Sequence, residues 1–149
     1  AHNGMSLEAL LSSVRRAFPG REMTVVFGCT GGKGLDRREG MAAAAGRWAD
    51  RVVLTEDDPG PEEVADICAD IVRYLAPFGK PWEIVPDREE AVEGTILSAR
   101  PPAVVVLAGK GAELQQKRRH GPEPCVPDAL LAQAALEKLD RRAAREGRP

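Results

Sequence analysis

The sequence predicts a Rossmann-like α/β domain, in which a doubly wound and mostly parallel sheet is flanked by helices. Short apolar runs alternate along the chain with amphipathic stretches of helical period, which is the pattern of repeated strand–helix units. Glycine and proline separate most of these units. The chain has 149 residues, of which 43% are hydrophobic and 30% charged, and this length and composition fit one globular domain.

The helices are predicted from apolar stripes and from residues typical of helix starts. The first stripe runs from Leu7 to Phe18, and Pro19 ends it. Four residues are expected at the starts of the later helices: Asp36, Pro61, Asp87 and Asp128. For Asp36 and Asp87, a glutamate three residues further on completes a capping box.

The strands are predicted over residues 24–27, 52–55, 82–85 and 103–108. The last run has no polar alternation, so we expect a central strand that is covered on both faces. A short antiparallel hairpin is expected around His120 near the C-terminus.

Composition and charge exclude several classes of function. The net charge is -2 and the six aromatic residues are scattered, which disfavours binding to nucleic acid or to an anionic membrane. Three cysteines without a C-x-x-C pair indicate neither a disulfide framework nor a metal site, and favour the reducing cytoplasm. No apolar run approaches the roughly 20 residues that span a bilayer.

Residues 28–34 form the first of three unusual loops that follow strands, where open parallel sheets bind ligands. Their sequence, Gly-Cys-Thr-Gly-Gly-Lys-Gly, matches neither the P-loop nor the dinucleotide fingerprint. One interpretation is a tight turn with glycines at positive φ. The other is an anion site, because Lys33, Arg37 and Arg38 crowd a helix N-terminus. Cys29 is expected to be a packed side chain, with a reactive thiol as the alternative.

The second and third loops combine acidic residues with glycines. Residues 56–60 read Glu-Asp-Asp-Pro-Gly, which fits either turn chemistry or a carboxylate pair that receives an ammonium group. Residues 108–113 read Ala-Gly-Lys-Gly-Ala-Glu, in which two glycines suit a close backbone approach. We expect the cations of the first loop to face the acids of the other two, an arrangement that suits a zwitterionic amino acid.

Taken in order, the motifs resemble the carboxy-terminal domain of the Mur ligases, and most of all the branch that adds the third amino acid to UDP-N-acetylmuramoyl-dipeptide (MurE). The matching segments are Phe-Gly-Cys at 27–29, Arg-Arg before Met41, Ala-Asp at 49–50, Thr-x-Asp-x-Pro at 55–59, Asp-Arg-x-x-Ala at 87–91 and Ala-Gly-Lys-Gly-x-Glu at 108–113. Because Ala-His-Asn resembles the end of the family's interdomain linker, residues 1–4 are expected to be a linker remnant and residues 5–149 the amino-acid-binding domain.

The resemblance implies an ATP-dependent amide ligase of peptidoglycan synthesis in the cytoplasm. A carboxylate of a UDP-N-acetylmuramoyl-peptide would attack the γ-phosphate of ATP, and the amine of an amino acid would then attack the acyl phosphate. ATP and Mg²⁺ would be bound mainly by a central domain of the same protein, which also has an N-terminal domain. The present domain would close over that site, hold the amino acid, contribute no catalytic residue and hydrolyse no ATP by itself.

The same resemblance assigns roles to individual residues. The amino-acid site would consist of five residues, with Arg38 on the substrate carboxylate: Arg38, Asp57, Asp58, Gly109 and Glu113. Four residues would lie near ATP: His2, Asn3, Lys33 and Arg37.

The sequence departs from the family pattern in three places. The G-D-R-D stretch of the family is Gly-Gly-Lys-Gly at 31–34, which loses both acids and puts its role toward ATP in question. The D-N-P-R arginine, which recognises the distal carboxylate of meso-diaminopimelate, is Gly60, and Asp58 adds negative charge beside it. The histidine after A-G-K-G is Ala112. Because of Asp58 and Gly60, we expect L-lysine or another amino acid without a distal carboxylate.

Two other functions stay open on the sequence. One is another Mur-type ligase, such as a cyanophycin- or polyglutamate-forming enzyme, and the other is a stand-alone amino-acid-binding regulatory module. For Asp87 and Arg88 we expect helix capping and surface pairing rather than catalysis.

Overall fold

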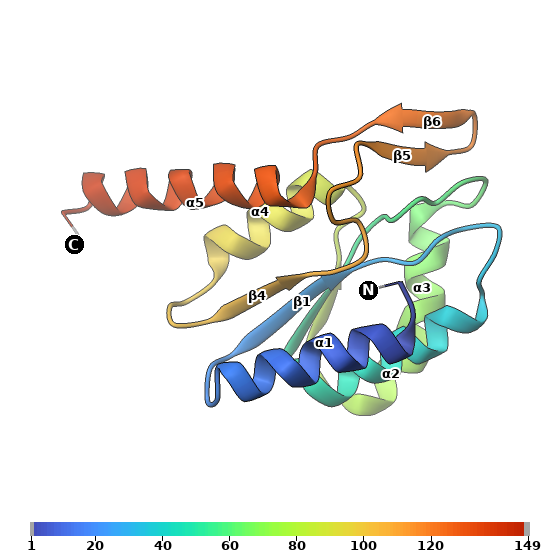
Figure 1. Cartoon of the computed structure of the whole chain (residues 1–149), viewed down its shortest axis with the longest axis horizontal. Helices are drawn as coiled ribbons and strands as arrows, with labels where there is room; N and C mark the ends of the chain where they lie inside the picture. Colours follow the sequence, from blue (N-terminus) through green and yellow to red (C-terminus); the bar gives the residue numbers. More distant parts are fainter. Residues whose placement is uncertain (1, 148–149) are drawn as a thin grey trace.

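The computed structural model describes residues 2–147 and shows a parallel four-stranded sheet between two layers of helices, with a hairpin beyond its end (Figure 1). The order of the strands in the sheet is β3-β2-β1-β4. This arrangement confirms the predicted doubly wound α/β class and the antiparallel hairpin. The strands are β1 (Met23–Phe27), β2 (Arg51–Leu54), β3 (Trp82–Ile84) and β4 (Val104–Leu107) in the sheet, and β5 (Gln115–Arg118) and β6 (Gly121–Pro124) in the hairpin.

The helices divide between the two faces of the sheet. On one face lie α1 (Gly4–Ala17), α2 (Asp36–Trp48) and α3 (Val64–Leu75), and a single 3-10 turn, η1 (Ala76–Phe78), continues α3. On the other face α4 (Arg88–Ser98) packs against α5 (Asp128–Arg145) (Figure 1).

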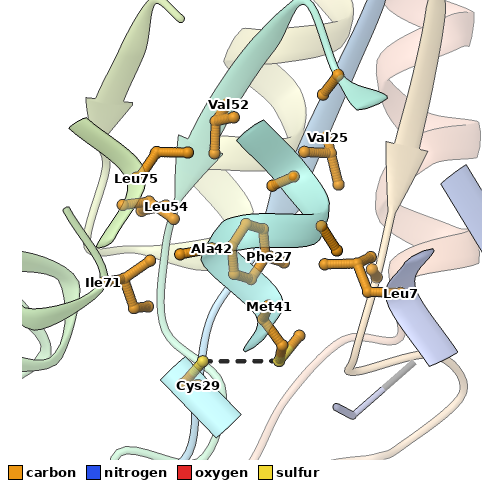
Figure 2. Close-up of a cluster of buried hydrophobic side chains, with 14 of the residues drawn as sticks. Leu7, Val25, Phe27, Cys29, Met41, Ala42, Val52, Leu54, Ile71 and Leu75 are labelled. Atoms are coloured by element: carbon orange, nitrogen blue, oxygen red, sulfur yellow. Dashed lines mark hydrogen bonds between the residues drawn. The ribbon is translucent and has the colours of Figure 1, made fainter. Parts of the chain in front are cut away.

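Phe27 lies at the centre of the larger core, under α1, α2 and α3 (Figure 2). Alternate residues of β1 and β2 point to this face because successive side chains of a strand alternate. Leu7 of α1 and Met41 of α2 pack beside the Phe27 ring, and the sulfur of Met41 lies 3.7 Å from that of Cys29. The core therefore extends to Cys29, two residues after the end of β1, where the candidate site begins.

The opposite face carries a smaller core built on Val26 and Val53, which α4 covers with Val92 and α5 with Ala135. Strand β4 contributes side chains to both cores, as the apolar run predicts, but it pairs only with β1. The prediction of a central strand is therefore wrong. Helices cover both faces of this edge strand, so its sequence does not differ from that of a central one.

The helix starts agree with the sequence only in part. The Asp87 carboxylate accepts a hydrogen bond from the Glu90 N–H (3.0 Å) and caps α4, as predicted. Asp36 does not cap α2, since Leu35 stands at that N-cap, and Asp128 is the first residue of α5 rather than its cap. Pro61 lies in the turn before α3.

No helix within residues 2–147 is both long and apolar enough to cross a membrane.

Candidate functional site

Three loops meet beyond the carboxyl ends of β1, β2 and β4, at the position where the strand order of the sheet reverses. The first two loops are interlocked through their backbones. A Cβ atom at Gly28 would collide with the carbonyl oxygen of Thr55, and one at Gly31 with that of Pro59. Gly32 and Gly34 have φ angles of 75° and 64°, so the tight-turn interpretation of residues 28–34 is correct.

The Arg38 guanidinium is buried beneath these loops, with only 3% of the residue exposed. Its Nη2 donates to Glu62 Oε2 at 2.8 Å and to the Thr30 carbonyl at 3.2 Å, and its Nη1 donates to Asp70 Oδ2 at 3.2 Å. Its Nε has no hydrogen-bond acceptor among residues 2–147. The predicted anion partner is thus supplied by the chain itself, through two carboxylates that the sequence analysis did not select.

Glu62 binds the first loop as well as Arg38. Its Oε2 accepts a hydrogen bond from the Gly32 N–H at 2.6 Å. This bond and the Arg38 guanidinium hold the pKa of Glu62 below its ordinary value. The Glu62 side chain remains about one-third exposed, whereas the guanidinium beneath it is not.

Asp57 is buried at the end of β2 and accepts no hydrogen bond from any of the described residues. Burial raises its pKa to about 6, with a further contribution from Asp58, although the positive charges of Arg88, Lys110 and His2 act in the opposite direction. The carboxylate lines a small hollow with His2 and Arg37, and the hollow has room for about one water molecule, since its volume is about 10 Å³.

Cys29 lines the same hollow but is not a reactive thiol. Burial raises its pKa to about 12, so the thiolate is not formed near neutral pH. The packed side chain expected for this residue is confirmed, and Cys68 is likewise buried.

Lys110 joins the second loop to the third, although the sequence analysis named its neighbours instead. Its buried ammonium donates to Asp58 Oδ1 (2.9 Å), to Glu113 Oε2 (3.3 Å) and to the Gln115 carbonyl. Burial by itself would lower the pKa of Lys110, but the bond to Asp58 and the charge of Asp58 outweigh it and raise this pKa. Asp58 and Glu113 are thus brought together, as expected, but with an internal cation between them. Gly109, just before Lys110, is buried with a φ of 97°.

The hairpin β5–β6 is attached to the second loop. Asp58 Oδ1 accepts from the Lys117 N–H at 2.8 Å, and the Gly60 N–H donates to the Lys117 carbonyl at 2.8 Å. Arg118 makes a two-pronged ion pair with Glu56, at 2.7 and 3.1 Å.

Arg88 is a structural centre of the site rather than the surface residue we predicted. It is buried and bonds both oxygens of Asp128 at 2.8 and 2.7 Å. It also donates to the carbonyls of Glu56 (3.1 Å) and Ala108 (3.0 Å), so it links the ends of β2 and β4 to the starts of α4 and α5. No sequence signal distinguishes it from an exposed arginine in a first helical turn.

The residues expected near ATP are exposed. Lys33 and Arg37 make no ion pair with another described residue. His2 lines the hollow beside Asp57, and Asn3 caps α1 by accepting from the Ser6 N–H at 2.8 Å. Ala1, also assigned to the linker, lies outside the described residues. Between residues 2 and 147 no group of three or more His, Cys, Asp or Glu side chains is arranged to hold a metal ion.

Comparison with known families decides what this arrangement belongs to. Residues 1–111 match the family described as Mur ligase, glutamate ligase domain. The chain therefore belongs to the Mur ligase family. The match ends in the third loop, so it includes Arg38, Asp57 and Asp58 and stops short of Glu113.

Relatives within this family act on different amino acids according to their names. The UDP-N-acetylmuramoyl-L-alanyl-D-glutamate–L-lysine ligase of Enterococcus faecalis is 40% identical over 93% of the chain, and the corresponding 2,6-diaminopimelate ligase of Synechococcus elongatus is 43% identical over 76%. A UDP-N-acetylmuramyl-tripeptide synthetase of Latilactobacillus sakei is 37% identical over 93%. The chain spans only 27%, 22% and 27% of these three relatives, respectively.

Solved structures of Mur ligases have the same fold. A UDP-N-acetylmuramoyl-L-alanyl-D-glutamate–2,6-diaminopimelate ligase superposes with a TM-score of 0.85 and 28% identity, over 94% of this chain and 28% of that one. A domain described as part of a UDP-N-acetylmuramate:L-alanyl-γ-D-glutamyl-meso-diaminopimelate ligase of Haemophilus ducreyi shares the fold at 18% identity and a TM-score of 0.59, over 93% of this chain and 85% of that one.

Proposed function

We propose that this chain is the amino-acid-binding domain of an ATP-dependent amide ligase of peptidoglycan synthesis. The ligase would add an amino acid to a UDP-N-acetylmuramoyl-peptide through an acyl phosphate, in the cytoplasm. Membership of the Mur ligase family supports the reaction class, and the relatives named above carry the same kind of domain in about a quarter of their length. The domain's role is to position the amine and to close over the ATP site.

The observation that carries this proposal is a pair of buried side chains of opposite charge, Arg38 in the first turn of α2 and Asp57 in the loop after β2. Arg38 has an unpaired Nε, and Asp57 has no hydrogen-bond donor among residues 2–147. The charge of Arg38 is balanced by Glu62 and Asp70, but its Nε–H donor and the Asp57 carboxylate lack partners within the described part of the chain. A buried polar group without a partner costs free energy, so such groups are typical of a site that a ligand completes. A zwitterionic amino acid supplies both partners, a carboxylate for Arg38 and an ammonium for Asp57.

Residues 2–147 do not offer Mg²⁺ a ligand set or ATP a P-loop. The described residues include no metal-ligating cluster, and the loop after β1 lacks P-loop spacing. We assign ATP and metal binding to another domain of the ligase. His2, Asn3, Lys33 and Arg37 would approach the nucleotide from this side, and the exposed cations among them suit the phosphates.

The second loop favours an amino acid without a distal carboxylate. Gly60 offers no guanidinium, and Lys110, the cation nearest to Asp58, is already bound to Asp58 and Glu113. A second substrate carboxylate would therefore meet acidic side chains without a free cation from this loop. We propose L-lysine or a similar amino acid as substrate, with Asp57, Asp58, Gly109 and Glu113 around it.

The test is ADP release by the ligase that carries this domain, with UDP-N-acetylmuramoyl-L-alanyl-D-glutamate, ATP and a panel of amino acids. We expect the highest kcat/KM with L-lysine and a loss of at least about tenfold in Asp57→Asn, because the ammonium loses a charged partner. Asp66→Asn, an exposed carboxylate of α3, is the matched control. Faster turnover with meso-diaminopimelate would contradict the substrate, and no amino-acid-dependent release would contradict the function.

A further inference from the structure

The Arg38 site is closed by a group of the chain itself. The guanidinium is almost fully buried, and its Nη2 is bonded to the carboxylate of Glu62, whose side chain is about one-third exposed. The nearby hollow holds only about one water molecule. A substrate carboxylate therefore has no access to Arg38 unless a side chain moves.

Glu62 is bound in the manner expected of a carboxylate ligand. One of its oxygens accepts from both a guanidinium and a backbone N–H, Arg38 Nη2 at 2.8 Å and Gly32 N at 2.6 Å. Backbone N–H groups of a glycine-rich loop beside an arginine are a common way for proteins to bind anions. The unpaired Arg38 Nε provides a further donor that Glu62 does not use.

We propose that the Glu62 carboxylate is a placeholder: it occupies the subsite beside Arg38 and the Gly32 N–H that the carboxylate of the amino-acid substrate would take, and the substrate displaces it. This proposal rests on the proposed function for the identity of the substrate, but not for the chemistry of the subsite. A bound carboxylate would use the Gly32 N–H and Arg38 Nη2 that Glu62 vacates, and the otherwise unpaired Nε.

The exchange leaves the local charge unchanged. Before it, one guanidinium lies between two carboxylates, those of Glu62 and Asp70. After it, the substrate carboxylate replaces that of Glu62, and Asp70 keeps its bond to Nη1 and holds the guanidinium in place. Because no buried charge is created or lost, the exchange avoids the penalty of an unpaired buried ion.

Glu62 is free to leave without disturbing a helix. It lies two residues before α3, in the turn where its own N–H donates to the Pro59 carbonyl at 3.1 Å. A change of side-chain rotamer releases the carboxylate into solvent, which it already reaches. In contrast, Asp70 is within α3 and its other oxygen is bound by Arg73 at 2.9 Å.

Occupation of the subsite by Glu62 lowers the affinity for the ligand. For a ligand that binds only when Glu62 is displaced, the apparent Kd is the intrinsic Kd divided by the fraction of molecules in which the subsite is open. A carboxylate tethered a short distance away competes at an effective concentration of about millimolar or more. Removal of this competitor should strengthen carboxylate binding at least about tenfold.

The experiment is an NMR titration of the 149-residue chain with sodium acetate and, separately, with L-lysine, following the Arg38 Nε–H and Gly32 N–H signals. We compare wild type with Glu62→Ala and with Glu62→Gln, which keeps the size of the side chain without its charge. Glu63→Gln is the matched control, because Glu63 is the adjacent, more exposed glutamate and pairs only with Arg119 among the described residues. Dispersed amide spectra check that each variant is folded.

The proposal predicts at least tenfold tighter acetate binding in both Glu62 variants, with shifts at Arg38 and Gly32, and no change in Glu63→Gln. Unchanged or weaker acetate binding in the folded Glu62 variants would overturn it.

Different results would overturn the proposed function and the placeholder role of Glu62. Tighter acetate binding in a ligase that uses no amino acid would overturn the proposed function alone. Amino-acid-dependent ADP release with an unchanged KM for the amino acid in Glu62→Gln would overturn the placeholder alone.

Discussion

Asp57 keeps a carboxyl group in the interior at the end of β2, where burial raises its pKa from an ordinary 3.8 to about 6. Between these two pH values the folded chain binds the proton more tightly than the unfolded chain does. The unfolded state is therefore favoured progressively as the pH rises from about 4 to about 6, and the cost persists above it. A loss of stability of this kind is expected where a charged group binds a ligand rather than stabilising the fold.

Asp57→Asn removes this cost and should stabilise the chain at pH 8 by about 3 kcal/mol, the equivalent of the raised pKa. At pH 4 the carboxyl is protonated in the folded chain, so the gain should fall below about 1 kcal/mol. Urea unfolding at the two pH values measures the difference, with Asp66→Asn expected to change stability by less than about 0.5 kcal/mol at either. Equal effects of Asp57→Asn at both pH values would show that the Asp57 charge is not costly.

At the scale of elements, the hairpin β5–β6 is held against the second loop by Asp58 and Lys110. Loss of one member of a buried ion pair leaves the other charge uncompensated, which typically costs 3–5 kcal/mol. Lys110→Ala should therefore lower the free energy of unfolding by about 3 kcal/mol and accelerate hydrogen exchange of the Lys117 amide, which donates to Asp58.

The control for this variant is Lys138→Ala. Lys138 pairs with Glu93 at 2.6 Å on the surface, where both side chains are nearly half exposed, so its loss should cost at most about 1 kcal/mol. If Lys110→Ala costs no more than this control and the hairpin amides exchange as before, the hairpin is anchored by other contacts.

The sequence predicted the helices and strands better than the side-chain contacts between them, and the reason is physical. Apolar period and turn residues are local, so the four sheet strands and the cap at Asp87 could be read directly. The partners of buried ions are separated along the chain, as with Arg88 and Asp128, 40 residues apart. The sequence motifs identified the loops of the candidate site, but not that Arg38 pairs with Glu62 and Asp70, since many exposed acids have the same local sequence character.

At the scale of the whole molecule, the chain has its own two-sided core but only part of the machinery that we propose for the reaction. We expect the 149-residue chain to unfold cooperatively and to release no phosphate from ATP above the buffer rate, with or without L-lysine. A phosphate-release assay on the purified chain, alongside thermal unfolding by circular dichroism, measures both. Phosphate release that follows the purified chain and is lost in Lys33→Ala would contradict this prediction.

The left-handed turn at Gly60 limits how the substrate preference of this domain can be redesigned. A Cβ atom at this position would have ordinary contacts, the nearest being 3.5 Å from the Gly31 carbonyl oxygen, so space does not prevent a side chain. The φ of 57° disfavours one, because an L-residue in this conformation costs about 1–2 kcal/mol and arginine has no local bond to offset it. An arginine grafted here would therefore either carry this strain or change the backbone path, and in the second case the Gly60 N–H bond to the hairpin would be the first contact at risk.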